Sequence, residues 1–133
     1  MNESYDAMEI LQENKNKIDW YYLSLNTYAI DILIKNKTKI NWSNLSLNKH
    51  DKAIQLLKEN IDKINWSNLS ENQNAINILQ ENKNKIDWYR LCKNKSYEAM
   101  DILKENLEEI NWFSLSSNEY AIDILIKNKE KIN

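Results

Sequence analysis

Apolar and polar positions along this chain follow one pattern that recurs at alternating intervals of 22 and 24 residues. Tryptophans mark it at Trp20, Trp42, Trp66, Trp88 and Trp112, and alanines mark it at Ala7, Ala29, Ala53, Ala75, Ala99 and Ala121. Self-similarity at a fixed period is typical of repeat proteins. The full period is a pair of units of 46 residues, and the near-identity of 28–37 with 120–129 points to duplication of that pair.

Each unit is predicted to form two short helices. In the first, Ala29, Ile32 and Leu33 stand at i, i+3 and i+4, which places them on one apolar stripe. In the second, Trp42 and Leu45 are three residues apart and share a face. We therefore expect the isoleucines, leucines and tryptophans to form the core.

The start of the second helix is marked by an Asp or Asn before every tryptophan. These side chains occupy the N-cap position, where an oxygen accepts from the backbone two or three residues on; they are Asp19, Asn41, Asn65, Asp87 and Asn111. Ile40 and Leu45 then stand at N′ and N4, the positions of a hydrophobic staple. Capping also explains the Asn-x-Ser matches at Asn41 and Asn65 better than glycosylation does.

The first helix has its own expected ends. Caps stand three residues before the alanine, at Ser4, Asn26, Asn72, Ser96 and Asn118. The chain has no Gly and no Pro, so a left-handed C′ residue would have to be Asn. The candidates are Asn14, Asn36, Asn60, Asn82, Asn106 and Asn128.

The predicted fold is all-α: an α-solenoid of six stacked short helix-turn-helix units, the last incomplete. One unit has too few apolar positions to offset the entropy of ordering it, so neighbours must share a core. We expect a single helical-repeat domain over 1–133 with units at about 2–25, 26–47, 48–71, 72–93, 94–117 and 118–133. Neither end carries an obvious polar cap, which favours association between copies.

The stretch NTYAIDILIKNKTKINWSNLS at 26–46 resembles short Trp/Asn-rich helical repeats of uncharacterised proteins from mimivirus-like giant DNA viruses. The resemblance covers essentially the whole chain, although those repeats carry Asn-Pro pairs where this chain has pairs such as Asn14-Lys15. The resemblance implies a helical scaffold and a viral origin, and it implies no activity. A viral origin fits the composition, because Asn, Lys and Ile have AT-rich codons.

Composition narrows the classes of function. The apolar runs are too short for a membrane span, and one cysteine cannot form an internal disulfide. A cytoplasmic protein, in the host cell if viral, is therefore expected. The net charge of −2 with interspersed signs argues against a nucleic-acid partner. No phosphate loop can form without glycine.

No residue pattern predicts catalysis, a metal site or a cofactor. Cys92 replaces a serine of the other units and is interpreted as a small, semi-buried thiol, far in sequence from the single histidine, His50. His50 is interpreted as a solvated linker residue. The chain is therefore predicted not to be an enzyme.

Two variable positions follow each tryptophan, and the helical period turns them away from the core. They are Tyr21 and Tyr22, Ser43 and Asn44, Ser67 and Asn68, Tyr89 and Arg90, Phe113 and Ser114. Tyrosine and arginine dominate binding hot spots, so the candidate partner-binding residues are Tyr21, Tyr22, Tyr89, Arg90 and Phe113. Packing of these aromatics between layers is the alternative. A second, weaker row consists of Tyr5, Tyr28, Tyr97 and Tyr120.

Three functions remain open at this point. The leading prediction is a non-catalytic scaffold that binds another protein, a host protein if the chain is viral. The second is a helical repeat that binds single-stranded nucleic acid, which requires a lysine-rich face. The third is a structural protein that assembles into homo-oligomers through its uncapped ends.

Overall fold

The computed structural model describes residue 9 and residues 13–132. Within these residues the chain forms ten α-helices and eight short 3-10 helices, and no strand. It divides into two compact units, 1–64 and 65–133, which are described separately. The prediction of an all-α repeat fold is confirmed, and the assignment of 1–133 to a single domain stays a prediction.

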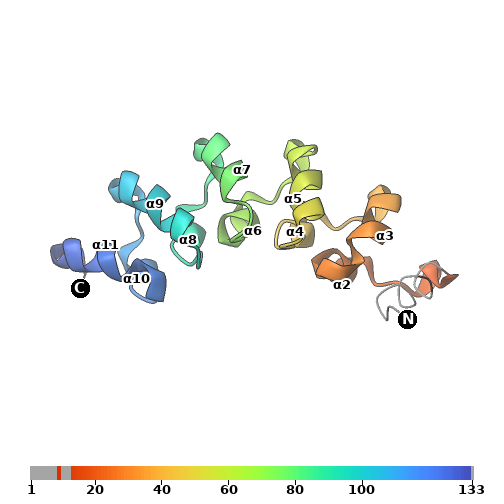
Figure 1. The fold of residues 1–133 in the computed structure, drawn as a ribbon, viewed down its shortest axis with the longest axis horizontal. Helices are drawn as coiled ribbons and strands as arrows, with labels where there is room; N and C mark the ends of the chain where they lie inside the picture. The colour runs from red at the N-terminus through yellow and green to blue at the C-terminus, as the bar shows by residue number, and fades with distance from the viewer. Residues whose placement is uncertain (1–8, 10–12, 133) are drawn as a thin grey trace. The chain divides into compact units, whose positions relative to one another are not determined.

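The first unit alternates helices of the two predicted kinds (Figure 1). Second-type helices begin at a tryptophan, first-type helices carry the alanine stripe, and a 3-10 turn follows each first-type helix. In chain order the elements are η1 (Lys15–Lys17), α2 (Trp20–Leu25), η2 (Thr27–Ala29), α3 (Ile30–Lys35), η3 (Lys37–Lys39), α4 (Trp42–Leu45), α5 (Asp51–Lys58) and η4 (Ile61–Lys63). Helices of the same type pack against each other, since α2 contacts α4 and α3 contacts α5.

The second unit repeats this order. Its elements are α6 (Trp66–Glu71), α7 (Ile76–Glu81), η5 (Lys83–Lys85), α8 (Trp88–Leu91), α9 (Tyr97–Glu105), η6 (Leu107–Glu109), α10 (Trp112–Leu115), η7 (Glu119–Ala121), α11 (Ile122–Lys127) and η8 (Lys129–Lys131). Here α6 contacts α8, and α7 contacts α9. The first two repeats of each unit therefore pack against each other through helices of the same kind, and the last repeat contacts α9 through η7.

The predicted core positions are buried, with the exception of the tryptophans. Ala29, Ile32 and Leu33 are at most 1% exposed, and Leu45 is fully buried. Every tryptophan is only half-buried, so the expectation that the indoles fill the core is wrong. The indole stands on the first residue of its helix and reaches the edge of the layer, where the Lys63 ammonium lies 4.9 Å from the Trp42 ring centroid.

The predicted N-caps of the second helices are confirmed. Asn41 Oδ1 accepts from the Asn44 amide at 3.0 Å, and Asp87 Oδ1 accepts from the Arg90 amide at 3.1 Å. Asp19, Asn65 and Asn111 do the same for their helices. Each bond satisfies one of the free N–H groups at a helix start, which explains why only Asp and Asn stand before Trp.

The asparagines at the end of the first helices are not left-handed. No described residue has a positive φ, and Asn36 has φ −130° and ψ 49°. Asn36 Nδ2 instead donates to the Ile32 carbonyl at 2.8 Å and closes the helix with its side chain. The same bond recurs at Asn60, Asn82, Asn106 and Asn128. The prediction was wrong because a side-chain amide can satisfy a terminal carbonyl without the backbone change that glycine makes easy.

The linker between the asparagine that closes one unit and the alanine of the next differs in length by two residues. Its length determines how the first helix begins. Where the linker is longer, the helix is continuous over eight or nine residues, as in α5 and α9. Where it is shorter, Asn26 and Asn118 start a 3-10 turn that leads into a six-residue α-helix. The predicted caps at Asn26, Asn72, Ser96 and Asn118 are confirmed by their bonds to a following amide, and Ser4 lies outside the described residues.

Buried asparagines connect successive repeats. Asn48 Nδ2 donates to the Ser24 carbonyl at 3.1 Å and to the Asn26 carbonyl at 3.2 Å. Its Oδ1 accepts from the His50 amide, so one side chain serves both neighbouring segments. In the second unit Asn94 Nδ2 donates to the Ser70 carbonyl at 3.0 Å. The asparagine that closes each sequence unit is thus a link between repeats.

Serines provide a second link at the end of the second helix. Ser24 Oγ donates to the Trp20 carbonyl and accepts from the Asn41 amide of the next repeat at 2.9 Å. Ser70 Oγ makes the same pair of bonds with Trp66 and Asp87. These two hydroxyls are fully buried, so both bonds are made away from water.

Candidate interaction surface

The first position after each tryptophan lies on the surface. Phe113 is 87% exposed, Tyr21 is 53% exposed and Tyr89 is 45% exposed. The equivalent serines, Ser43 and Ser67, are half-buried. The prediction that this position is free of the core is confirmed, and the aromatic residues there are not required by the packing of the repeat.

The second position has a different role in α4 and α10, where its side chain contacts the preceding repeat. Asn44 is 7% exposed, and its Nδ2 donates to the Tyr21 carbonyl at 2.7 Å. Ser114 is 5% exposed, and its Oγ donates to the Tyr89 carbonyl at 3.2 Å. The expectation that both positions are variable surface is therefore wrong for Asn44 and Ser114. In α4 and α10 the third helical residue turns toward the neighbouring layer, whereas in α2 the third residue, Tyr22, is 68% exposed.

Arg90 occupies the same second position and pairs within the protein. Its Nη1 lies 2.8 Å from Glu71 Oε2, and hydrogen bonding to this carboxylate raises the pKa of the guanidinium. About two fifths of each side chain is exposed, so the pair contributes little to stability. Its effect is to hold both side chains beside Tyr89.

A pocket of about 380 Å³ lies in the second unit beside two of the predicted binding residues, Tyr89 and Phe113. Tyr89 and Phe113 supply its aromatic walls, and Lys93 Nζ stands 4.3 Å from the Tyr89 ring centroid. The complete lining is Glu71, Tyr89, Lys93, Lys95, Phe113, Ser114, Ser117 and Asn118. The sequence prediction omitted the lysines, although Lys93 stands four residues after Tyr89, the spacing that places two side chains on one helical face.

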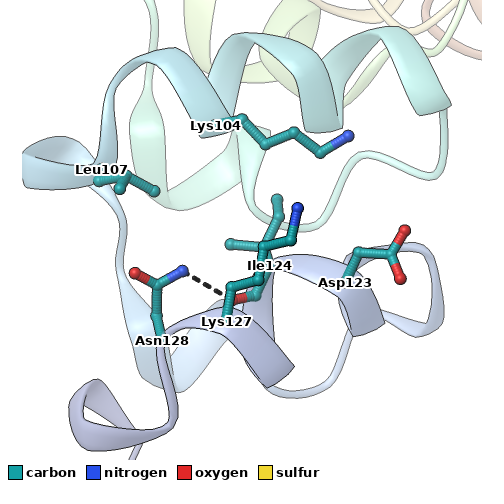
Figure 2. Close-up of a pocket in the computed structure, with 6 residues that line it drawn as sticks. All are labelled: Lys104, Leu107, Asp123, Ile124, Lys127 and Asn128. Atoms are coloured by element: carbon teal, nitrogen blue, oxygen red, sulfur yellow. Dashed lines mark hydrogen bonds between the residues drawn. The ribbon is translucent and has the colours of Figure 1, made fainter.

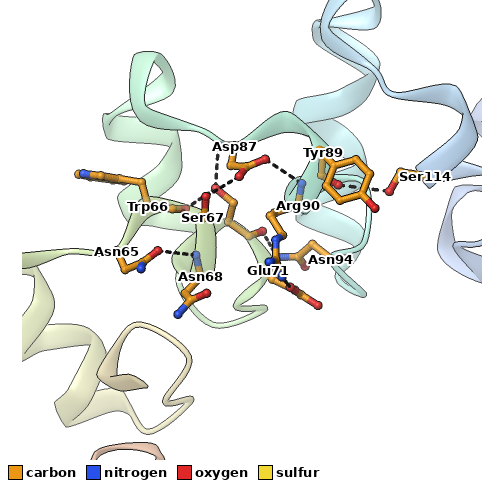
Figure 3. A network of polar contacts seen from close by, with 11 residues as sticks. Asn65, Trp66, Ser67, Asn68, Glu71, Asp87, Tyr89, Arg90, Asn94 and Ser114 are labelled. Atoms are coloured by element: carbon orange, nitrogen blue, oxygen red, sulfur yellow. Dashed lines mark hydrogen bonds and ion pairs between the residues drawn. The ribbon is translucent and has the colours of Figure 1, made fainter. Parts of the chain in front are cut away.

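A network of polar contacts surrounds the start of α8, the helix that carries Tyr89 (Figure 3). The Ser67 hydroxyl donates to Asp87 Oδ2, while Asp87 Oδ1 accepts from the Arg90 amide. Asp87 therefore fixes the start of α8, and the Arg90–Glu71 pair fixes the other side. The Arg90 amide donates to Asp87 and the Tyr89 carbonyl accepts from the Ser114 hydroxyl, so the backbone that carries the Tyr89 ring is bonded to its surroundings.

Tyr21 and Tyr22 form a separate group in the first unit. Their ring centroids are 5.1 Å apart at an interplanar angle of 85°, an edge-to-face contact. Tyr22 is 68% exposed. The five predicted residues therefore form two groups, Tyr21 with Tyr22 in one compact unit and Tyr89, Arg90 and Phe113 in the other.

The weaker tyrosine row is partly brought together. Tyr97 and Tyr120 contact each other at 5.2 Å between ring centroids and line an open pocket of about 430 Å³ with Glu119, Ile122 and Asp123. Tyr28 is 80% exposed in the first unit, and Tyr5 lies outside the described residues.

A further pocket of about 320 Å³ separates α9 and η6 from α11, with Ile124 at its base (Figure 2). Asn128 beside it is already bonded to the Ile124 carbonyl.

Cys92 and His50, the two residues considered above for catalysis, both have structural surroundings. Cys92 is fully buried, not semi-buried as expected, and burial raises the pKa of its thiol. His50 is half-buried and caps α5, because its Nδ1 accepts from the Lys52 amide at 3.1 Å. His50 stands three residues before Ala53, so the spacing that identified the other caps also marks it.

Among the described residues, no cluster of three or more His, Cys, Asp or Glu side chains is arranged to hold a metal ion. Within the same part of the chain, no helix has the length and apolar character needed to cross a membrane.

Comparison with known protein families, with curated proteins and with solved structures finds no match to this chain. The resemblance to giant-virus repeats and the expected viral origin therefore stay predictions. The function is argued below from the geometry of the exposed side chains.

Proposed function

We propose that this protein is a non-catalytic scaffold that binds another protein through the surface around Tyr89 and Phe113. The observation that carries the proposal is the 87% exposure of Phe113 beside a pocket that Tyr89 also lines. The equivalent positions in two other repeats hold serine, so the repeat packs without an aromatic ring there. An exposed ring that packing does not require is typical of a binding surface.

The chemistry of the pocket suits a peptide segment with an apolar side chain next to an acidic one. Phe113 and Tyr89 offer rigid apolar contact area. Lys93 and Lys95 provide positive charge at the rim, since the Glu71 carboxylate is already paired with Arg90. Lys95 lies 3.9 Å from Glu119 with both side chains mostly exposed, and such a pair exchanges readily for another carboxylate.

Peptide display against the folded protein tests the proposal. Selected peptides should contain an aromatic or aliphatic residue beside Asp or Glu, and Phe113→Ser should weaken their binding at least tenfold, as loss of a hot-spot residue does. Phe113→Ser installs the residue found at Ser43 and Ser67, so the fold should be retained.

Tyr28→Asn is the matched control. It removes an equally exposed aromatic from the first unit and installs the residue found at the equivalent Asn74. Peptides whose affinity falls equally with both variants, or with neither, would contradict the proposal.

A further inference from the structure

The 3-10 turns of the first unit carry a concentration of positive charge. These turns are η1, η3 and η4, and together they hold five lysines and one aspartate: Lys15, Lys17, Lys37, Lys39 and Lys63, with Asp62. All six side chains are exposed. The turns that follow α3 and α5 lie on the same side of the unit (Figure 1). The net charge of the whole chain, −2, does not reveal this local excess, because acidic residues elsewhere balance it.

The second unit has no such excess at the equivalent turns. Its turns η5, η6 and η8 hold four lysines and three glutamates. One of the lysines, Lys83, also lies 3.6 Å from Glu105. Lys15, Lys17, Lys37 and Lys39 make no ion pair with any described residue, and the same is true of Lys85, Lys129 and Lys131. The difference between the two units therefore lies in the glutamates of η6 and η8. The same repeat thus presents a basic edge in one unit and a mixed edge in the other.

Half-exposed indoles accompany the basic turns. Each turn is separated by two residues from a helix that begins with tryptophan, and in the first unit these are Trp20 and Trp42. The Lys63 ammonium lies 4.9 Å from the Trp42 ring centroid, so a lysine of one turn and the tryptophan of the preceding helix share one surface. Lys39 holds the equivalent position one repeat earlier, relative to Trp20.

We infer that this edge binds single-stranded nucleic acid. Lysine ammonium groups that alternate with indole faces match a strand that alternates phosphates with bases. A helical repeat that presents one base-stacking group per unit is a known route to single-strand recognition. A lipid surface fits less well, because Ile61 is the single exposed apolar side chain of the three turns, and the other residues of η1, η3 and η4 are Lys, Asn, Thr and Asp.

Fluorescence anisotropy with a labelled 12-nucleotide oligouridylate tests the inference on the full chain. The variant K15Q/K17Q/K37Q/K39Q should lose at least tenfold in affinity at 100 mM salt. Its slope of log K against log salt should flatten by about 3, because each phosphate contact on a single strand contributes about 0.7. The matched control K83Q/K85Q/K129Q/K131Q removes the same number of charges from the second unit and should change affinity less than threefold.

The indole contribution is tested with Trp42→Leu and its control Trp112→Leu. Stacking of one base is worth about 1–3 kcal/mol, so Trp42→Leu should weaken binding about 5- to 150-fold, and Trp112→Leu should not. Circular dichroism confirms that each variant retains its helices. Binding should also quench the tryptophan fluorescence of the wild type and of Trp112→Leu.

Four outcomes would overturn the inference. They are equal losses for the two quadruple variants, no binding at 50 mM salt, affinity for duplex RNA equal to that for the single strand, and displacement of the oligonucleotide by phosphatidylserine vesicles with tighter binding to the vesicles. The last result would assign the edge to a membrane surface. None of these results bears on the Phe113 surface, which belongs to the other unit.

Discussion

The side-chain amide of Asn118 donates to two backbone carbonyls of the preceding repeat, Cys92 and Asn94, both at 2.8 Å. Its Oδ1 accepts from the Tyr120 amide in its own repeat. Asn118 is 4% exposed, so all three bonds are made in a medium where they are strong and where their loss is costly. One residue type therefore joins each repeat to its neighbour and starts the next helix.

The variant Asn118→Ala tests the importance of this link. Removing the amide leaves two buried carbonyls without their donor, and each unsatisfied group costs about 1–3 kcal/mol. We expect the free energy of unfolding to fall by about 2–6 kcal/mol in urea titrations. The control Asn84→Ala removes an exposed asparagine from η5 and should change it by less than about 0.5 kcal/mol. Equal effects of the two substitutions would contradict a role for Asn118 as a link.

Asn82→Gly distinguishes two ways of ending a helix. Asn82 has φ −134°, and its Nδ2 donates to the Ile78 carbonyl at 2.8 Å. Glycine removes that bond and adds backbone entropy to the unfolded chain, so stability should fall by about 1–2 kcal/mol. A left-handed residue would instead be stabilised by glycine. Thermal unfolding of Asn82→Gly beside Asn82→Ala decides between the two, because only the left-handed geometry would make the glycine variant the more stable.

Cys92 stands where Ser24 and Ser70 make two buried bonds each. Its sulfur is a weak acceptor for the Asn111 amide, which lowers the thiol pKa less than burial raises it. Cys92→Ser should restore the bonds to Trp88 and Asn111 and leave stability unchanged or raise it by up to about 1 kcal/mol. A loss above 1 kcal/mol in urea unfolding would show that the site selects for the thiol.

The pH dependence of unfolding provides a second test at Cys92. Because the folded-state pKa is raised above 9.0, the wild type keeps its full stability below the pKa of the unfolded thiol. Above that value the unfolded chain loses a proton that the folded chain retains, so stability falls as pH rises, by at most 1.4 kcal/mol per pH unit. Cys92→Ser should lack this decline between pH 9 and 10, which chemical unfolding at several pH values would show.

The fold was largely predictable from the sequence because its signals are local and repeated. The stripe of Ala29, Ile32 and Leu33 and the cap at Asn41 depend on spacings within one helix, and the structure confirms both. The asparagine links were not predictable, because Asn48 bonds to residues 22 and 24 positions away. The sequence of a single unit does not indicate which backbone groups of the preceding unit its asparagine will bind.

The candidate surface was predicted only in part for the same reason. Helical period alone identified Tyr89 and Phe113 as outward positions. It also placed Asn44 outside, because the period within one helix does not show that the preceding repeat contacts the third residue of α4. The segregation of lysines in η1 and η3 was equally hidden, because net charge averages over both units.

One hexapeptide, Ile-Asp-Ile-Leu-Ile-Lys, forms both α3 and α11, and the surroundings of the two copies differ. In α3 Ile30 is 2% exposed and Leu33 is fully buried, because α5 of the next repeat packs on that helix. In α11 the equivalent Ile122 is 54% exposed, and Ile126 is 57% exposed. The comparison separates the contribution of a neighbouring repeat from that of the helix itself, since the local sequence is constant.

The matched substitutions Ile30→Ala and Ile122→Ala measure that contribution. Truncation of a buried isoleucine costs about 2–5 kcal/mol, whereas truncation at a half-exposed site should cost less than about 1 kcal/mol. Helix propensity cancels because both changes are made in the same hexapeptide. Urea unfolding should therefore show a difference of at least 1 kcal/mol between them. If Ile122→Ala proves as costly as Ile30→Ala at low protein concentration and its cost grows with concentration, then Ile122 is covered by a second copy of the chain, and light scattering should show the corresponding increase in mass.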